Sequence, residues 1–192
     1  MNVNLSSRQL VRDAIADEVA AAVDESGIRA SWLVLEVTET VLMADPVVAA
    51  AALGHIRDLG VRVALDDFGS GYSSLSHLRR FPIDIVKIDK SFVDDVATEG
   101  VQSAIARSII DLGRAMQIET VAEGIKVDEQ AEMLRSLGCE FGQGYYFAKP
   151  MEAGAWAGLI HAEAIGDGEG PGTRMAAEAA AAASKRRRRA AA

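Results

Sequence analysis

This sequence of 192 residues has very little cysteine and histidine. It contains one cysteine, Cys139, which excludes an internal disulfide framework, and three histidines that lie far apart without the spacing of metal ligands. We therefore expect no zinc site. No apolar run is long enough to cross a bilayer, and the N-terminus lacks the basic and apolar regions of a signal peptide. We expect a cytoplasmic protein without a membrane span.

The chain also lacks a general excess of positive charge. Its formal net charge is −8, and the run Lys185 to Arg189 contributes +5 to that total, which leaves −13 for all other residues. A surface of this sign does not attract nucleic acid, so we expect no DNA or RNA partner for the acidic main body. If the chain acts on a phosphate compound, bound divalent cations must offset the acidic groups.

The composition is that of a folded domain, with 49% hydrophobic and 25% charged residues. Short strand-like runs alternate with helix-like runs, and no repeat of fixed period appears. This alternation predicts an α/β fold in which helices cover a parallel sheet. The predicted strands are 2–5, 33–38, 62–68, 85–89, 119–123 and 141–147, and the predicted helices are 7–23, 46–59, 74–80, 101–116, 127–137 and 152–165.

The composition changes near Gly166. Residues 1–165 form the predicted barrel-type domain, whereas residues 166–192 are rich in alanine, glycine and arginine and are of low complexity. We expect this tail to be disordered or weakly helical. Its KRRRR cluster is typical of a solvated tail, and contact with nucleic acid or anionic lipid is the alternative.

The predicted strand at 62–68 ends in two adjacent carboxylates, Asp66 and Asp67. Two ionised carboxylates side by side repel each other, and their burial costs free energy unless a cation, a lysine or an arginine compensates. The structural alternative is that Asp67 caps a helix beginning near Ser73, with Gly69 and Gly71 making the turn.

Polar residues also follow or end the other predicted strands. In a parallel α/β fold the functional site lies at the carboxyl ends of the strands, so these residues predict one convergent site. The alternative is a set of separate buried ion pairs, for example Lys87 with Asp67. The polar residues at these ends are Asn4, Glu36 with Glu39, Asp66 with Asp67, Lys87 with Asp89, Glu123 and Gln143.

The side chains of this predicted site are hard oxygen ligands, which suit Mg²⁺ or Mn²⁺. Two such cations can clamp a phosphodiester and activate water. Lys87 would orient the attacking water or offset phosphate charge, while Glu123 and Gln143 would hold metal, water or substrate. The residues alone indicate metal-assisted hydrolysis, with enolate or aldol chemistry as alternatives.

Several motifs resemble those of the EAL domain family, the cyclic di-GMP phosphodiesterases. The resemblance runs from about Val3 to Pro150, and the motifs that contain the paired aspartates and KID are highly specific to that family. The matching segments are VNLSSRQL, LEVTET, ALDDFGSGYSSLSHLRRFPIDIVKIDKSFV, TVAEGI and GCEFGQGYYFAKP.

The resemblance implies a (β/α)8 TIM-barrel-type fold that hydrolyses cyclic di-GMP to pGpG with Mg²⁺ or Mn²⁺. It further implies that Glu39 anchors the loop Phe68 to Ser74, which in the family links the metal site to dimerisation, so a homodimer through this loop is expected. The implied metal ligands are Asn4, Glu36, Asp66, Asp67 and Glu123; the implied catalytic residues are Lys87, Glu123 and Asp67; the implied substrate contacts are Gln143 and Asp89.

The sequence departs from the family pattern in two places. The Glu-Ala-Leu strand of the family, whose glutamate is a metal ligand, would precede VNLSSRQL. We therefore expect about six of the eight strand–helix units and an unprotected edge at Asn2 to Leu5. The second departure is Lys126, where the family more often has glutamate; this change weakens metal affinity or loop positioning, or is tolerated at the surface.

These departures lead to two functional hypotheses. The first is a metal-dependent cyclic di-GMP phosphodiesterase domain, of which this chain alone is expected to be weakly active or inactive. The second is a degenerate, non-catalytic EAL module that binds nucleotide or a protein partner.

Overall fold

The computed structural model describes residues 1–12, 14–69, 78–152 and 154. The chain forms two compact units, of which the first comprises Met1–Asp89 and Ser108–Thr120. The second unit comprises Lys90–Arg107 and the chain from Val121 onward.

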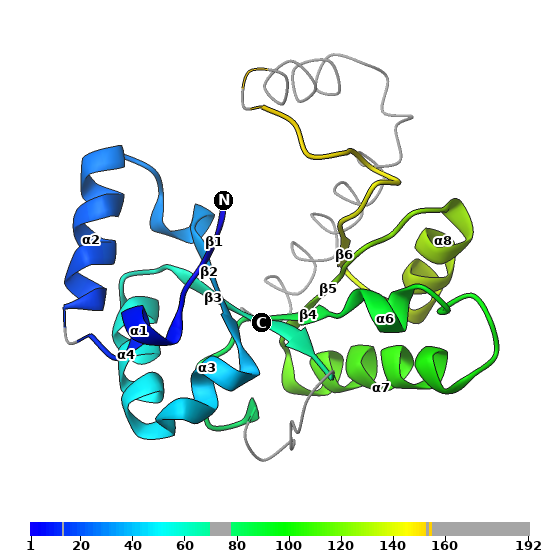
Figure 1. Ribbon diagram of the computed structural model, residues 1–192, viewed down its shortest axis with the longest axis horizontal. Coiled ribbons are helices and arrows are strands. Elements are labelled where there is room, and N and C mark those ends of the chain that lie inside the picture. The colour runs from blue at the N-terminus through cyan, green and yellow to red at the C-terminus, as the bar shows by residue number, and fades with distance from the viewer. Residues whose placement is uncertain (13, 70–77, 153, 155–192) are drawn as a thin grey trace, which may run out of the picture. The chain divides into compact units, whose positions relative to one another are not determined.

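The strands are parallel and follow one another in the sheet in chain order, as Figure 1 shows. This arrangement confirms the predicted α/β fold with a parallel sheet. All six strands of the described chain begin within one residue of the predicted start, because short apolar runs between helical segments mark them well. The strands are β1 (Asn2–Asn4), β2 (Val34–Thr38), β3 (Arg62–Phe68), β4 (Ile85–Ile88), β5 (Glu119–Ala122) and β6 (Phe141–Gly142).

In the first unit, α2 packs against α4 and α1 against α3. Figure 1 shows these helices beside strands β1 to β3. The largest helix, α7, contributes residues to both units. The helices are α1 (Ser7–Leu10), α2 (Ile15–Ser26), α3 (Glu39–Ala44), α4 (Pro46–Asp58), α6 (Lys90–Val93), α7 (Val101–Met116) and α8 (Asp128–Leu137), with a 3-10 turn at Ala30–Trp32.

Apolar side chains of the first unit pack on one face of the sheet, and polar side chains lie on the other. Val37 of β2 and Leu53 and Ile56 of α4 are completely buried. Each such side chain stabilises the fold by about 1.5–3 kcal/mol relative to exposure. Since successive side chains of a strand alternate faces, Glu36 and Thr38 point away from the face on which Val37 lies.

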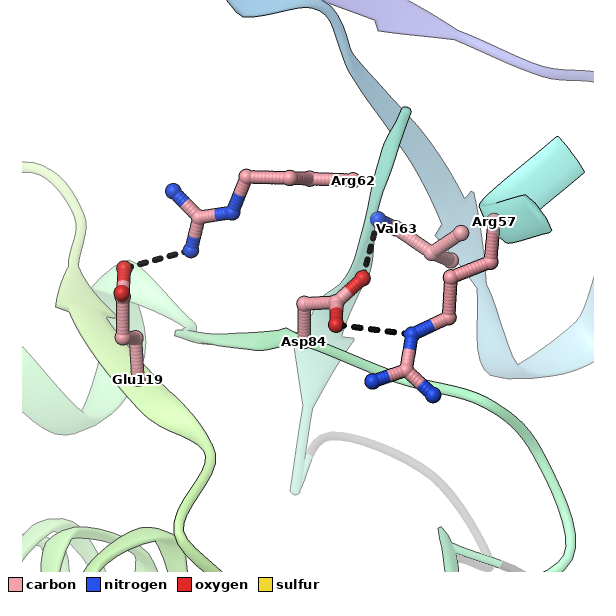
Figure 2. A network of polar contacts seen from close by, with 5 residues as sticks. All are labelled: Arg57, Arg62, Val63, Asp84 and Glu119. Carbon is pink, nitrogen blue, oxygen red and sulfur yellow. Dashed lines mark hydrogen bonds and ion pairs between the residues drawn. The ribbon is translucent and has the colours of Figure 1, made fainter. Parts of the chain in front are cut away.

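The amino ends of the strands in the first unit are joined by a polar network, drawn in Figure 2. Asp84, just before β4, accepts hydrogen bonds from Arg57 Nε at 2.9 Å and from the backbone N–H of Val63 at 3.0 Å. Arg62, the first residue of β3, donates to Glu119, the first residue of β5, at 2.5 Å. Each carboxylate here thus has its own arginine.

Two predicted elements are wrong in extent. The single helix predicted at 7–23 is two helices, because hydrogen bonds from Arg12 N to Gln9 O and from Ile15 N to Arg12 O form a turn between them. Leu10 and Ile15 are buried on both sides of this turn, so the apolar spacing continues although the helix does not.

The last strand is shorter than the predicted range 141–147. It ends at Gly142, and the chain then turns, with Tyr146 N bonded to Ile125 O at 3.0 Å and Phe147 N to Gly144 O at 3.1 Å. The short helices α3 and α6 were not predicted, since a single turn of helix has little apolar periodicity.

Some predictions concern residues that are not described. Most of the loop Phe68 to Ser74, of the helix at 74–80 and of the helix at 152–165 lies outside the described residues, as does all of the tail 166–192. The predicted dimer contact through that loop therefore stays a prediction. In the described part of the chain, no helix has the length and apolar character needed to span a membrane.

Candidate metal and substrate site

In the first unit, a buried lysine lies between two carboxylates at the carboxyl ends of β2, β3 and β4. Lys87 Nζ is 2.9 Å from Glu36 Oε1 and 3.0 Å from Asp66 Oδ1. Lys87 and Glu36 are only 5% and 6% exposed. The fold thus brings these three side chains together, and Lys87 pairs with Glu36 and Asp66, whereas the alternative considered from the sequence was a pair with Asp67.

Strand register explains why these side chains meet. Asn4 lies beside Glu36 in the sheet, and Thr38 lies beside Asp66. In a parallel sheet, neighbours in register present their side chains on the same face, so Glu36 and Thr38 of β2 and Asp66 of β3 lie on one face of the sheet. The sheet register then shifts between Leu65 and Phe68, a bulge that re-aims the residues between them.

The first strand supplies an amide that the sequence reading missed. Asn2 Nδ2 donates to Glu36 Oε1 at 2.7 Å, whereas the predicted ligand Asn4 is exposed next to Glu36 in the register. Both asparagines are on the same face because they are two residues apart. That spacing was the available signal for Asn2.

Asp67 has an unusual backbone and an unfavourable electrostatic environment. Its φ is +55°, in the left-handed region that aspartate adopts more readily than most residues, and its N–H donates to Asp66 Oδ1 at 3.1 Å. Desolvation raises the pKa of Asp67, and the neighbouring charges of Asp66 and Asp89 raise it further, against a lowering by Lys87. Burial and the neighbouring acidic charges together thus outweigh the lowering of the pKa by Lys87.

The donor set of this cluster suits a hard divalent cation. Four carboxylates of the described chain (Glu36, Asp66, Asp67 and Asp89) lie around the one ammonium group of Lys87, and desolvation together with the charges of Asp66 and Asp89 raises the pKa of Asp67. Carboxylate and amide oxygens are the ligands that Mg²⁺ and Mn²⁺ prefer. The residues present thus fit a metal-binding role.

In the second unit, Glu123 and Gln143 are brought together. Gln143 Nε2 donates to Glu123 Oε1 at 2.7 Å. Gln143 lies one residue beyond the end of β6, not within it as predicted, but its backbone still bonds to Ala122 O and Ile125 N, at 2.8 and 3.1 Å. The amide thereby orients the carboxylate.

Two glycines allow the chain around Glu123 to pack closely. Gly124 has φ +72°, and a Cβ there would lie 2.5 Å from Lys90 Cγ. A Cβ on Gly144 would lie 2.1 Å from the carbonyl oxygen of Ile125. Any larger residue at either position would push the loop that carries Glu123 out of place.

Lys126 belongs to a hydrogen-bond network that the sequence reading missed. Its Nζ is 2.7 Å from Asp94 Oδ1, and its N–H donates to Gln130 Oε1 at 2.8 Å. The buried Gln130 in turn donates to the carbonyl of Asp94 at 3.1 Å. The hydrogen bond to Asp94 raises the pKa of Lys126. Asp94 and Lys126 are 32 residues apart, and no local pattern relates them.

The two remaining predicted site residues are Asp89 and Glu39. Asp89 lies directly after β4 and acts on Asp67 through its charge. Glu39 is the first residue of α3, and the loop it is predicted to anchor lies mostly outside the described residues. The role of Glu39 therefore remains a prediction.

The motifs described above match a known protein family. The family model described as EAL domain matches residues 1–150. Cyclic di-GMP phosphodiesterase NbdA of Pseudomonas aeruginosa is 39% identical over 160 residues, which make up 83% of this chain and 20% of NbdA. The chain thus spans about a fifth of the length of that relative.

Solved structures show the same fold. The PaMucR phosphodiesterase in complex with c-di-GMP has a TM-score of 0.76 and 37% identity, over 81% of this chain and 63% of that chain. BlrP1 of Klebsiella pneumoniae, in complex with manganese and cyclic di-GMP, has a TM-score of 0.72 and 32% identity, over 78% of this chain and 38% of that chain. A calcium and cyclic di-GMP complex of BlrP1 is equally similar. These similarities identify the α/β fold as part of a TIM-type barrel.

Proposed function

Since the chain belongs to the EAL domain family, we propose that its acidic strand ends are the metal-binding part of a phosphodiesterase that hydrolyses cyclic di-GMP to pGpG. The observation that carries this proposal is the cluster around Lys87. Glu36 and Asp66 share one lysine, and beside them desolvation and the charges of Asp66 and Asp89 raise the pKa of Asp67. Such a cluster is costly for a fold and is typical of a site that binds cations.

The proposed metal ligands are Asn4, Glu36, Asp66, Asp67 and Glu123. The first four lie on β1, β2 and β3 of the first unit, and Glu123 is assigned by its family motif. When bound, Mg²⁺ or Mn²⁺ would polarise the phosphodiester and lower the pKa of water. We propose Asn2 as a residue that orients Glu36, since it donates a hydrogen bond to the same oxygen that faces Lys87.

Lys87 has a dual role in this proposal. It holds Glu36 and Asp66 in place within the fold, and we infer that its ammonium group also offsets phosphate charge or orients water near these carboxylates. Gln143 holds the carboxylate of Glu123 through its amide, and Asp89 and Gln143 are the proposed substrate contacts.

The proposal is tested by titrating the purified 192-residue chain with cyclic di-GMP, with Mn²⁺ and with EDTA. We expect binding that requires Mn²⁺ and is lost in Asp66→Asn. Binding that is unchanged by both EDTA and this substitution would refute a metal-dependent site. For hydrolysis, chromatographic detection of pGpG should show slow or no turnover by this chain alone, and rapid turnover that Asp67→Ala abolishes would contradict that expectation.

A non-catalytic nucleotide-binding EAL module is the second candidate. It is favoured by the pairing of Lys87 with Glu36 and Asp66, because an internal cation allows these carboxylates to be buried without metal. The two candidates differ in their need for metal: the module would bind cyclic di-GMP in EDTA and produce no pGpG with Mn²⁺.

A further inference from the structure

Gln130, a residue of α8 that is 6% exposed, joins three segments of the second unit through its side-chain amide. Its Oε1 accepts hydrogen bonds from the backbone N–H groups of Lys126 at 2.8 Å and of Val127 at 3.3 Å. Its Nε2 donates to the carbonyl oxygen of Asp94, just after α6, at 3.1 Å. The buried amide thus acts as acceptor and donor at once, which fixes its orientation.

Helix capping explains only one of these hydrogen bonds. Val127 directly precedes α8, and a glutamine at the third position of a helix commonly accepts a bond from the N–H of the residue before that helix. Capping does not explain the shorter bond to Lys126, or the bond to Asp94, which lies 36 residues away. Gln130 therefore also holds the segment that precedes the helix.

This segment, Ile125–Val127, is hydrogen-bonded at every backbone N–H. The N–H of Ile125 donates to the carbonyl of Gln143 at 3.1 Å, and the other two N–H groups donate to Gln130. The carbonyl of Ile125 accepts from the N–H of Tyr146 at 3.0 Å, and the Ile125 side chain is completely buried. The segment is thus bonded to α8 through its second half and to the chain after β6 through its first residue.

The same segment supports the predicted site residues of the second unit. Ile125 follows Glu123 by two residues, and the glycine between them has φ +72°. Glycine has little backbone preference of its own, so the contacts of the neighbouring residues must fix its conformation. Gln143, whose amide donates to Glu123 Oε1 at 2.7 Å, has its backbone bonded to Ile125 as well. The carboxylate and the amide that holds it therefore share one support.

We propose that Gln130 is a positioning residue: it holds the segment Ile125–Val127 and thereby fixes the geometry of Glu123 and Gln143. This role depends on the proposed function, in which Glu123 is a metal ligand. Residues that orient a ligand from outside the coordination shell change metal affinity by about 10- to 100-fold when they are replaced.

The ion pair of Lys126 with Asp94 has a smaller part in this support. Its atoms are 2.7 Å apart, but the two side chains are 47% and 36% exposed, and an exposed pair contributes little. Lys126→Met keeps the backbone N–H that Gln130 accepts. It should therefore change Mn²⁺ affinity by less than about threefold, which separates the role of the buried amide from that of the lysine.

The first test compares Gln130→Met with Leu134→Val in the 192-residue chain without metal. Leu134 is completely buried one turn further along α8, so its substitution disturbs the packing of the same helix and leaves the amide in place. The readout is the NMR signal of the Gln143 side-chain amide, assigned by comparison with Gln143→Leu. We expect Gln130→Met to shift this signal toward that of an exposed amide, and Leu134→Val to leave it unchanged. Equal shifts would overturn the proposal.

The second test measures Mn²⁺ affinity by calorimetry in a double-mutant cycle. Gln130→Met should weaken binding by about tenfold, the lower end of the range for residues outside the coordination shell. In the Glu123→Ala background the same substitution should have no further effect, because its effect is transmitted through Glu123. Additive weakening by the two substitutions would show that Gln130 acts by another route and would overturn the proposal.

Hydrogen exchange of the unsubstituted chain tests the proposal even if Gln130→Met does not fold. The N–H of Lys126 should be protected to the same degree as that of Ile125, since both are bonded within the fold. Exchange of the Lys126 N–H at the rate of an exposed loop would contradict the proposed support.

The two proposals fail separately. If Glu123→Ala leaves Mn²⁺ affinity unchanged while Gln130→Met shifts the Gln143 signal, the assignment of Glu123 as a metal ligand fails and the positioning role stands. If Glu123→Ala weakens Mn²⁺ binding while Gln130→Met changes neither the signal nor the affinity, the positioning role is refuted and the metal site stands.

Discussion

The two ends of the strands in the first unit handle charge in opposite ways. At the amino ends, two carboxylates each have an arginine within hydrogen-bonding distance, and Asp84 also accepts a backbone N–H. At the carboxyl ends, one lysine pairs with both Glu36 and Asp66, while desolvation and the charges of Asp66 and Asp89 raise the pKa of Asp67. The same strands thus have one end with balanced charge and one end with an excess of negative charge.

This difference separates carboxylates that stabilise the fold from carboxylates that are retained for binding. A carboxylate whose charge is offset in the fold contributes to stability, so its loss is destabilising. A carboxylate whose charge is not offset opposes folding and is retained where it binds something. Neutralising one carboxylate at each end should therefore shift stability in opposite directions.

The largest effect is expected from removing the lysine at the carboxyl ends. Lys87→Met leaves Glu36 and Asp66 buried without their cation, and breaking such a buried pair from one side costs about 3–5 kcal/mol. Urea denaturation in EDTA measures this loss. Lys149→Met, at an exposed lysine, should change stability by less than about 0.5 kcal/mol. If Lys87→Met is no more destabilising than this control, the carboxylates do not depend on Lys87.

A smaller loss is expected at the amino ends. Asp84→Ala leaves Arg57 without its partner and the N–H of Val63 without an acceptor, which costs about 1–3 kcal/mol. Asp84→Asn should restore part of the stability, because its amide oxygen still accepts a hydrogen bond. Equal stability of the alanine variant and the unsubstituted chain would show that the network of Figure 2 carries no stability.

Asp67→Asn tests the difference between the two strand ends most directly, because it should stabilise the metal-free chain. Asparagine also adopts the left-handed backbone of this position and removes a charge that Asp66 and Asp89 repel. We expect a gain of about 1 kcal/mol, typical of surface-charge optimisation, together with a loss of Mn²⁺ affinity. A decrease in stability as large as that of Asp84→Asn would contradict the proposed difference between the ends.

The smallest effect is expected for the pair Arg62 and Glu119. Their side chains are 32% and 34% exposed, and a partly exposed ion pair contributes about 0.2–1 kcal/mol. Arg62→Met should lower the free energy of unfolding by that amount, and the difference should shrink as salt is added. If the loss of stability does not depend on salt, Arg62 stabilises the fold through the packing of its side chain and not through its charge.

Much of the fold was predictable because it depends on local patterns. β3 and α7 have the predicted bounds, since apolar runs and helical spacing define them. The turn between α1 and α2 was not predicted, because buried apolar residues, Leu10 and Ile15, lie on both sides of it and no glycine or proline marks it. The turn after β6 was missed because it depends on bonds to Ile125, which is distant in the sequence.

The sequence predicted which residues belong to the candidate site better than it predicted which of them pair with each other. The carboxylates and Lys87 follow from the rule that parallel strands meet at their carboxyl ends. Which carboxylates Lys87 binds depends on register and on the bulge in β3, which the sequence does not encode locally. The network of Lys126, Asp94 and Gln130 joins three separate segments and needs the folded chain.

The connectivity of the two units has a practical consequence for dissecting this protein. The chain passes from the first unit to the second after Asp89, returns at Ser108 and leaves again after Thr120. Helix α7 is therefore shared, and a cut at any single peptide bond leaves at least one unit without part of its chain. Limited proteolysis or truncation should not release either unit as an intact fragment, so the two units have to be studied together.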